Sequence, residues 1–184
     1  MQVMQGEGGA RLSAIPTPAP PSSARRRALT LTFIAVAIIT YAADQATKVW
    51  ALAMLSDERA RELLGTVIQL RLVRNPGAAF SLGTGSTWVL TLLAVVVLVA
   101  IVRTSRRLGS RAWAWALGLV LGGALGNLTD RLVREPSVGQ GHVIDFIDYG
   151  WFIGNVADIA IVAAAALIGL LALRGIGIDG SRDG

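Results

Sequence analysis

The sequence of 184 residues contains no cysteine, a single histidine and few charged side chains. Without cysteine the chain forms no disulfide, and thiolate nucleophiles and thiolate metal ligands are excluded. A soluble domain has about 25% charged residues, whereas this chain has 16% charged and 53% hydrophobic residues. Together with the mean hydropathy of +0.58, this composition indicates an integral membrane protein with one compact bundle of a few spans.

The scarcity of histidine excludes several kinds of peptidase. A Ser-His-Asp triad needs a histidine, and His142 lies in a predicted loop with no serine motif nearby. The His-Glu-x-x-His motif of zinc peptidases is absent, as is a glycine-rich loop with Lys and Ser or Thr that would bind phosphate. The candidate chemistry is therefore left to carboxylates, with Asn and Arg around them.

Four apolar runs approach the length of about 20 residues that crosses a bilayer. They cover residues 28–50, 86–102, 112–128 and 155–173. We expect one four-span domain over residues 28–174, with outer loops at about 52–85 and 131–154. The flanking segments, 1–27 and 175–184, are predicted to be cytoplasmic tails, the first of them disordered because it is rich in Pro, Gly, Ser and Ala.

The start of the first run has a second interpretation. Basic residues directly before an apolar stretch are typical of a cleaved signal peptide. This run is too long for one, and it ends in Asp44, Gln45 and Lys48, which are unusual in a discarded segment. The pattern therefore favours a retained first span.

Arginines are concentrated in the segments that four spans place on one side of the membrane. These are Arg25, Arg26, Arg27, Arg103, Arg106, Arg107, Arg111 and Arg174. By the positive-inside rule both termini are then cytoplasmic, and the net charge of +5 reflects topology rather than nucleic-acid binding. The bias is incomplete, because the opposite loops contain Arg59, Arg61, Arg71 and Arg74.

Four aspartates fall near the outer ends of the predicted spans or in the second outer loop. They are Asp44, Asp130, Asp145 and Asp158. A carboxylate at the centre of a membrane helix costs roughly 2.5–3.5 kcal/mol on insertion scales, so an acid in such a segment is a candidate functional residue. Four acids gathered at one membrane face indicate a single site.

The outer loops and the third span have their own patterns. Residues 68–72 alternate apolar and polar side chains, and residues 142–152 are short, apolar and aromatic, so both segments are predicted strands of a small sheet on the outer surface. In the third span Gly118, Gly122 and Gly126 recur every four residues and lie along one helix face. Such a stripe is typical of close helix packing in membranes.

Two carboxylates held close together cannot both ionise easily, so one keeps a proton while the other acts as a base. Asp145 and Asp158 have no adjacent basic residue and lie among apolar neighbours, which makes them the better candidates for a shared proton. Sequence spacing alone does not bring them together.

The other two acids have a basic residue close by. Lys48 follows Asp44 at the i+4 position on the predicted helix, and Arg131 follows Asp130 directly. An ion pair or an orienting role therefore competes with catalysis at both positions.

Five motifs in order resemble the lipoprotein signal peptidases, the bacterial signal peptidase II family. They are Asp44-Gln45-Ala46-Thr47-Lys48, Asn75-Pro76-Gly77-Ala78-Ala79-Phe80-Ser81, the block from Gly122 to Arg131, Val143-Ile144-Asp145-Phe146 and Asn155-Val156-Ala157-Asp158. The resemblance implies an all-α membrane protein, a four-transmembrane-helix bundle with a small extracytoplasmic β-cradle. It also implies an aspartic endopeptidase without metal or other cofactor, whose catalytic residues match Asp145 and Asp158.

The same resemblance assigns roles to the remaining motif residues. Positions that bind substrate or support the catalytic pair match Asn75, Asn127, Arg131 and Asn155, and structural positions match Asp44, Lys48, Gly77 and Asp130. The implied substrate is a prolipoprotein whose lipobox Cys carries diacylglycerol, with cleavage just before that Cys. We expect a monomer in the bacterial cytoplasmic membrane that contacts membrane lipid, binds no nucleic acid and has its active site at the outer face.

The chain departs from the family pattern at two positions. Gly154 stands where the family usually has Phe, and Ile159 stands where a small residue, usually Ser, follows the second aspartate. Both changes predict looser packing around Asp158. Asp148, three residues after Asp145, is a competing candidate for the catalytic position.

Three functions of other classes compete with this interpretation. A proton-coupled membrane transporter also uses intramembrane Asp residues, but it predicts acids at mid-depth and an internal repeat, which the sequence lacks. A metal-dependent lipid phosphatase would use the acids as ligands and would be sensitive to chelators. A purely structural membrane protein leaves four costly acids unexplained.

Overall fold

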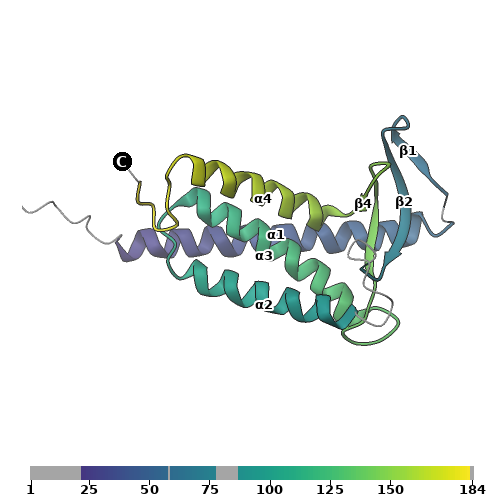
Figure 1. Ribbon diagram of the computed structural model, residues 1–184, viewed down its shortest axis with the longest axis horizontal. Coiled ribbons are helices and arrows are strands. Elements are labelled where there is room, and N and C mark those ends of the chain that lie inside the picture. The colour runs from purple at the N-terminus through teal and green to yellow at the C-terminus, as the bar shows by residue number, and fades with distance from the viewer. Residues whose placement is uncertain (1–21, 58, 78–86, 183–184) are drawn as a thin grey trace, which may run out of the picture.

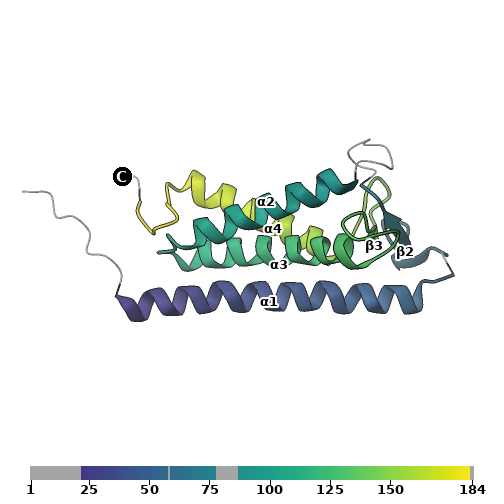
Figure 2. The same ribbon diagram turned by 90° about the horizontal axis from the view of Figure 1, so that it is seen from below.

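The computed structural model describes residues 22–57, 59–77 and 87–182. It contains four helices that are long and apolar enough to cross a membrane (Figures 1 and 2). They are α1 (Ser23–Met54), α2 (Thr87–Ser105), α3 (Arg111–Val133) and α4 (Val156–Leu173). The expected four-span bundle is confirmed, and α3 packs against each of the other three helices.

Helices α1 and α3 extend furthest beyond the predicted spans. Helix α1 begins at Ser23 rather than Ala28, because the Ser22 side chain accepts a hydrogen bond from the Arg25 N–H and caps the first turn. The predicted disordered tail is therefore wrong for residues 23–27, and residues 1–21 lie outside the described part of the chain. Helix α3 continues to Val133, which places Asp130 in its last turns.

Helix α1 is long enough for its C-terminal end to pack against a small sheet. Its 32 residues span about 48 Å, more than the roughly 30 Å hydrocarbon core. The last turns of α1 therefore reach the sheet, where Ala51 and Leu55 pack with Leu72, Ile144 and Phe146 in a buried apolar cluster. Figure 2 shows α1 running the length of the bundle to the sheet.

The predicted sheet is present at one end of the bundle, opposite the C-terminal segment (Figure 1). Its four strands are antiparallel, in the order β1 (Arg61–Leu64), β2 (Ile68–Asn75), β3 (Val143–Asp148) and β4 (Ile153–Gly154). Asn75 pairs with Val143, so its diagonal neighbour on the same face is Asp145. Strand pairing thus brings together two candidate residues that are far apart in sequence.

The glycine stripe of α3 packs against α1, as predicted. A Cβ atom on Gly118 would lie 2.8 Å from the Phe33 carbonyl oxygen, and one on Gly122 would lie 2.6 Å from the Thr40 Cβ. The third glycine, Gly126, faces a side chain, because a Cβ there would collide with the Asp44 carboxylate. The stripe therefore provides both close helix packing and the space for a buried acid.

We predict that Gly122→Ala lowers the thermal unfolding midpoint of the purified protein in detergent. The added methyl group meets the Ala37 carbonyl oxygen at 2.5 Å, and overpacking of this kind costs about 1–3 kcal/mol. Gly169→Ala in α4 is the matched control, since nothing lies within 4 Å of that position. An equal loss of stability in both variants would contradict the packing role of Gly122.

Candidate active site

A fully buried lysine lies at the centre of the polar residues between α1 and α3. Lys48 is the only lysine in the chain. Its Nζ lies 2.8 Å from Asp44 Oδ2 and 2.7 Å from Asp130 Oδ2, and it donates a hydrogen bond of 2.8 Å to Asn127 Oδ1. The predicted Asp44–Lys48 pair is confirmed, and the side chains of Lys48, Asp44 and Asp130 are all fully buried.

Asp44 and Asp130 also accept hydrogen bonds from backbone N–H groups that lie next to the candidate catalytic residues. Asp44 Oδ1 accepts a hydrogen bond of 3.0 Å from the Ala157 N–H, directly before Asp158. Asp130 Oδ2 accepts one of 3.2 Å from the Ile144 N–H, directly before Asp145. The Lys48 cluster, defined as Lys48, Asp44 and Asp130, thus holds the start of α4 and strand β3.

The basic partners of Asp130 differ from the expected one. Arg134 Nε lies 2.6 Å from Asp130 Oδ1, and Lys48 binds the other oxygen. Of the two roles left open beside Asp130, an ion pair with Arg131 is therefore not formed among the described residues. On a helix the i+4 residue lies on the same face, whereas the i+1 residue points about 100° away. The i+4 spacing to Arg134 was the signal in the sequence that identifies the true partner.

Asn155 contacts both candidate catalytic residues. Its Nδ2 donates a hydrogen bond of 2.7 Å to Asp145 Oδ1, and its backbone N–H donates one of 3.0 Å to Asp158 Oδ2. The Asn155 Oδ1 in turn accepts a bond of 3.1 Å from the Asp158 N–H, which completes a capping box at the start of α4. A helix cap therefore joins the two carboxylates in one site.

Two further predicted residues complete the polar shell around the pair. Asn127 Nδ2 donates to Asp158 Oδ1 at 3.2 Å, while its Oδ1 accepts from Lys48 and, at 3.1 Å, from Asn155 Nδ2. Asn127 therefore connects the Lys48 cluster to the carboxylate of α4. All of these contacts involve residues that the sequence motifs singled out.

On the other side of the pair, Asn75 Nδ2 donates a hydrogen bond of 2.8 Å to Asp145 Oδ2. The Gly77 N–H donates a bond of 2.8 Å to Asn75 Oδ1, and Gly77 has a φ of +110° that favours glycine. A side chain at Gly77 would also collide with Leu90. Gly77 thus orients Asn75, while the rest of this motif, residues 78–81, lies outside the described residues.

Asp145 is nearly inaccessible to water, with 3% of its surface exposed. Burial raises the pKa of Asp145 to about 6, and the charge of Asp158 adds to the rise, while hydrogen bonds from Asn75 and Asn155 and the charge of Lys48 oppose it. Because the rise dominates, Asp145 keeps its proton to a higher pH than an ordinary aspartate.

Arg131 stands apart from the hydrogen-bond network. Its Nη1 is buried and has no hydrogen-bond partner among the described residues, although its charge interacts with Asp145 and Asp130. A buried donor without a partner is costly. The geometry therefore leaves a donor beside the carboxylates that an acceptor group of a ligand would satisfy.

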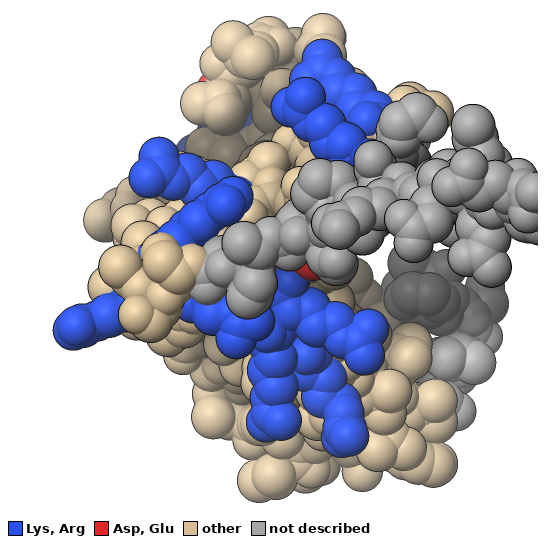
Figure 3. Space-filling model, turned by 90° about the vertical axis from the view of Figure 1, so that its left-hand side faces the viewer, with Lys and Arg blue, Asp and Glu red and all other residues tan. Residues whose placement is uncertain are grey.

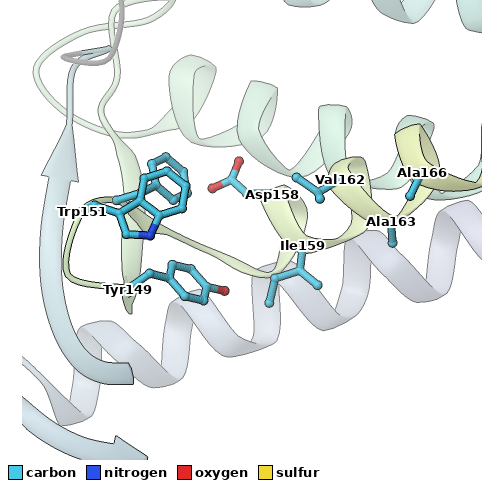
Figure 4. A pocket seen from close by; sticks show the side chains of 8 residues that line it. Tyr149, Trp151, Asp158, Ile159, Val162, Ala163 and Ala166 are labelled. Atoms are coloured by element: carbon cyan, nitrogen blue, oxygen red, sulfur yellow. The ribbon is translucent and has the colours of Figure 1, made fainter. Parts of the chain in front are cut away.

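An apolar pocket of about 610 Å³ opens beside Asp158. One side is formed by the aromatic residues Tyr149, Trp151 and Phe152 of the β3–β4 connection, whose rings stack or tilt against one another. The other side is the face of α4 that carries Ile159, Val162, Ala163 and Ala166. In Figure 4 Asp158 lies between the aromatic side and the α4 side. An apolar ligand therefore fits next to a carboxylate.

Both departures from the family pattern lie at this pocket. A Cβ on Gly154 would lie 2.6 Å from the Phe152 ring and 2.8 Å from Asp158 Oδ2, so the glycine leaves room for both groups. Ile159 lines the apolar wall. The predicted loosening around Asp158 is not evident in its hydrogen bonds, since both carboxylate oxygens have donors.

Asp148 does not join the site. It pairs with Arg71 at 3.1 Å and accepts a hydrogen bond from the Gly150 N–H. The aromatic residues Tyr149 and Trp151 were not predicted to be functional. Their position directly after a strand that carries an acid was the only signal in the sequence.

Comparisons with known proteins agree with these features. The profile of the family described as Signal peptidase (SPase) II matches residues 36–174. The lipoprotein signal peptidase of Rhodococcus jostii (strain RHA1) is 50% identical over 167 residues, which cover 90% of this chain and 84% of the relative. That of Leifsonia xyli subsp. xyli (strain CTCB07) is 48% identical over 168 residues, covering 90% and 78% respectively.

The fold is also similar to two solved bacterial membrane enzyme structures, both determined by the in meso method. The structure at 1.9 Å resolution has a TM-score of 0.66 and 26% identity, covering 78% of this chain and 93% of that one. The structure at 2.3 Å has a TM-score of 0.68 and 25% identity, covering 83% and 94%.

We predict that Lys48→Met destabilises the folded protein strongly. The substitution leaves Asp44 and Asp130 buried without their shared cation, and removal of one member of a buried ion pair costs about 3–5 kcal/mol. Thermal or denaturant unfolding in detergent measures the loss. Arg26→Met, at an exposed position of the same helix, is the control and should change stability by less than about 0.5 kcal/mol. Equal stability of the Lys48→Met and Arg26→Met proteins would refute the role of the cluster.

Proposed function

The chain belongs to the signal peptidase II family of membrane peptidases, and we propose that Asp145 and Asp158 are its catalytic pair. The observation that carries this assignment is Asn155, which donates hydrogen bonds to both carboxylates. The raised pKa of Asp145 supports it further, because a pair of this kind needs one protonated and one ionised carboxyl. The transporter alternative receives no support, since the relatives are peptidases.

In the proposed reaction Asp158 takes a proton from a water molecule as the resulting hydroxide attacks the scissile carbonyl carbon. Asp145 donates its proton to the carbonyl oxygen, whose C=O π bond opens as the new C–O bond forms. As the tetrahedral intermediate collapses, Asp145 takes back the proton from the hydroxyl oxygen, the C=O bond re-forms and the C–N bond breaks. Asp158 gives its proton to the leaving nitrogen, which returns both carboxyl groups to their starting states. The two carboxyl groups supply both proton transfers, so the reaction needs no metal ion or organic cofactor.

The surrounding polar residues have two proposed roles. Asn75, Asn127 and Asn155 hold the carboxylates through the hydrogen bonds described above and so support the pair. Arg131 binds the substrate, because its buried Nη1 has no partner among the described residues and lies in the field of Asp145. Substrate carbonyl oxygens are acceptors of the required kind.

The proposed substrate is a prolipoprotein whose lipobox Cys carries diacylglycerol, cleaved just before that Cys. The apolar pocket beside Asp158 supports a lipid-linked substrate, because its volume of about 610 Å³ is lined by aromatic and aliphatic side chains. Such a pocket would hold apolar groups while the peptide reaches the carboxylates. All the residues proposed for this chemistry come from one chain, which supports a monomer as the active unit.

We place both termini in the cytoplasm and the sheet with the active site at the outer face. Arg25, Arg26 and Arg27 begin α1 and Arg174 ends α4, all at the end of the bundle away from the sheet. At the sheet end, two of the arginines that weakened the bias are paired with acids, namely Arg61 with Asp57 and Arg71 with Asp148. The positive-inside rule depends on Lys and Arg rather than on net charge, and the concentration of arginine at the end away from the sheet favours this orientation.

We predict that Asp145→Asn and Asp158→Asn each abolish cleavage of a diacylglyceryl-modified prolipoprotein by the purified protein. Loss of a general acid or base costs about 10²- to 10⁴-fold in rate. Asp148→Asn, three positions along from Asp145 and paired with Arg71, is the matched control and should retain cleavage. Near-normal turnover by the Asp145→Asn protein, with an unfolding midpoint like that of wild type, would overturn the assignment.

We also predict that kcat/KM falls as the pH rises past about 6, the pKa of Asp145. Protonated Asp145 is the proposed acid, so activity is lost as the pH rises through this pKa. At low pH activity also falls, because protonation of Asp158 removes the proposed base, and kcat/KM reports both groups in the free enzyme. The hydrogen bond from Asn75 lowers this pKa. Asn75→Leu should therefore move the alkaline midpoint to higher pH, whatever its effect on kcat. A midpoint that stays fixed or moves down would contradict the proton donor role of Asp145.

A further inference from the structure

The end of the molecule opposite the sheet presents a strongly basic surface. Figure 3 looks onto this end and shows basic side chains, all of them arginines since the one lysine is buried, spread across it. The helix ends and connections there contribute Arg25, Arg26, Arg27, Arg103, Arg106, Arg107, Arg111 and Arg174. None of these arginines forms an ion pair within residues 22–57, 59–77 and 87–182.

Part of this surface is a groove of about 460 Å³. It is lined by Arg103, Thr104, Arg106 and Arg107 at the end of α2, with one apolar residue, Ile178, from the C-terminal segment. The three arginines are exposed, and arginine binds phosphate oxygens through two parallel N–H bonds. The groove therefore combines three phosphate-binding side chains with an apolar wall.

The C-terminal segment holds the apolar wall in place. The Gly109 N–H donates a hydrogen bond of 2.9 Å to the Ile178 carbonyl oxygen, and the Trp113 Nε1 donates one of 2.9 Å to Ile176. Gly109 has no room for a side chain, because a Cβ there would collide with the backbone of Asp179. The groove is thus built by tight contact between two distant parts of the chain.

The nearby acid leaves the arginine charges uncompensated. Asp179 accepts hydrogen bonds through Oδ1 from the Ser181 N–H at 2.9 Å and the Ser181 hydroxyl at 2.6 Å. It forms no ion pair with a described arginine. No acid in residues 22–57, 59–77 and 87–182 pairs with Arg103, Arg106 or Arg107, so a bound anion is the expected partner.

The surface of α2 leads from this groove along the membrane-spanning part of the helix. Val95 and Val99 precede Arg103 at i−8 and i−4, so they lie on the same helix face. Their side chains are 40% and 51% exposed. A ligand with a charged head at Arg103 thus meets an apolar strip that matches lipid chains, which distinguishes a phospholipid from free phosphate.

We propose that this groove binds the phosphate headgroup of an anionic phospholipid, with an acyl chain along Val99 and Val95 of α2. Basic groups at the cytoplasmic side of membrane helices attract anionic lipids. The proposal is independent of the catalytic pair. It is consistent with the orientation above, in which this end faces the anionic inner leaflet.

The test measures lipid binding to the purified full-length protein in neutral detergent by native mass spectrometry. The probes are dioleoyl phosphatidylglycerol and dioleoyl phosphatidylcholine, which differ only in the headgroup. Wild type should bind the anionic lipid at least about tenfold more tightly, given three arginines at the site. The triple variant Arg103→Gln, Arg106→Gln, Arg107→Gln should lose this preference.

A second triple variant separates a specific site from general attraction between charges. Arg59→Gln, Arg61→Gln, Arg71→Gln removes the same charge at the sheet end and should keep the wild-type preference. Equal loss in both triple variants, or an unchanged preference in the first, would overturn the proposal. If the first triple variant fails to fold, Arg106→Gln alone should still weaken binding of the anionic lipid several-fold.

Two more measurements test the choice of lipid over free anion. Inorganic phosphate at millimolar concentration should not displace phosphatidylglycerol, and displacement would assign the groove to a soluble phosphate instead. Val99→Gln should weaken phosphatidylglycerol binding while all three arginines remain. No effect of Val99→Gln would remove the acyl-chain part of the proposal.

Discussion

The arrangement of this protein depends on one buried ammonium group. Lys48 is fully inaccessible to water and binds Asp44, Asp130 and Asn127 at 2.7–2.8 Å. A buried charge is tolerated only when it is paired and hydrogen-bonded, so this contact fixes α1 against α3. The same acids hold the backbone at Ile144 and Ala157, each one residue before a proposed catalytic aspartate. The contact between α1 and α3 therefore also fixes the positions of strand β3 and of the start of α4.

The Lys48 cluster in turn requires a glycine at position 126, because a side chain there would occupy the space of an acid. At Gly126 a Cβ would collide with the Asp44 carboxylate, whereas at Gly118 and Gly122 it would meet the main chain or side chains of α1. The four-residue period of these glycines predicted close helix packing, and the structure confirms it. The period did not predict that Gly126 makes room for the Asp44 carboxylate. Residue spacing indicates which helix face a residue lies on, but not which group of the neighbouring helix it contacts.

Much of the site could be predicted because its residues have a strong local signal. Apolar runs interrupted by acids identified four spans and four carboxylates, and the Asp44–Lys48 spacing identified an ion pair. For Asp130 the sequence analysis considered only the adjacent Arg131 as an ionic partner and left its role open, whereas helix geometry favours Arg134 at i+4. The contact of Asn75 with Asp145 depends on strand register, and the bridging by Asn155 depends on a helix cap beside a strand. Neither can be read from one segment of sequence alone.

The four carboxylates divide by how their charge is balanced. Asp44 and Asp130 carry two negative charges, and Lys48 and Arg134 bind them with two positive charges, so this group is neutral as a whole. Burial raises the pKa of Asp145 to about 6, and it outweighs the opposing hydrogen bonds from Asn75 and Asn155 and the smaller opposing effect of the Lys48 charge. Asp44 and Asp130 thus balance the charge of the cation that holds the site together, while Asp145 has a pKa set mainly by its own burial.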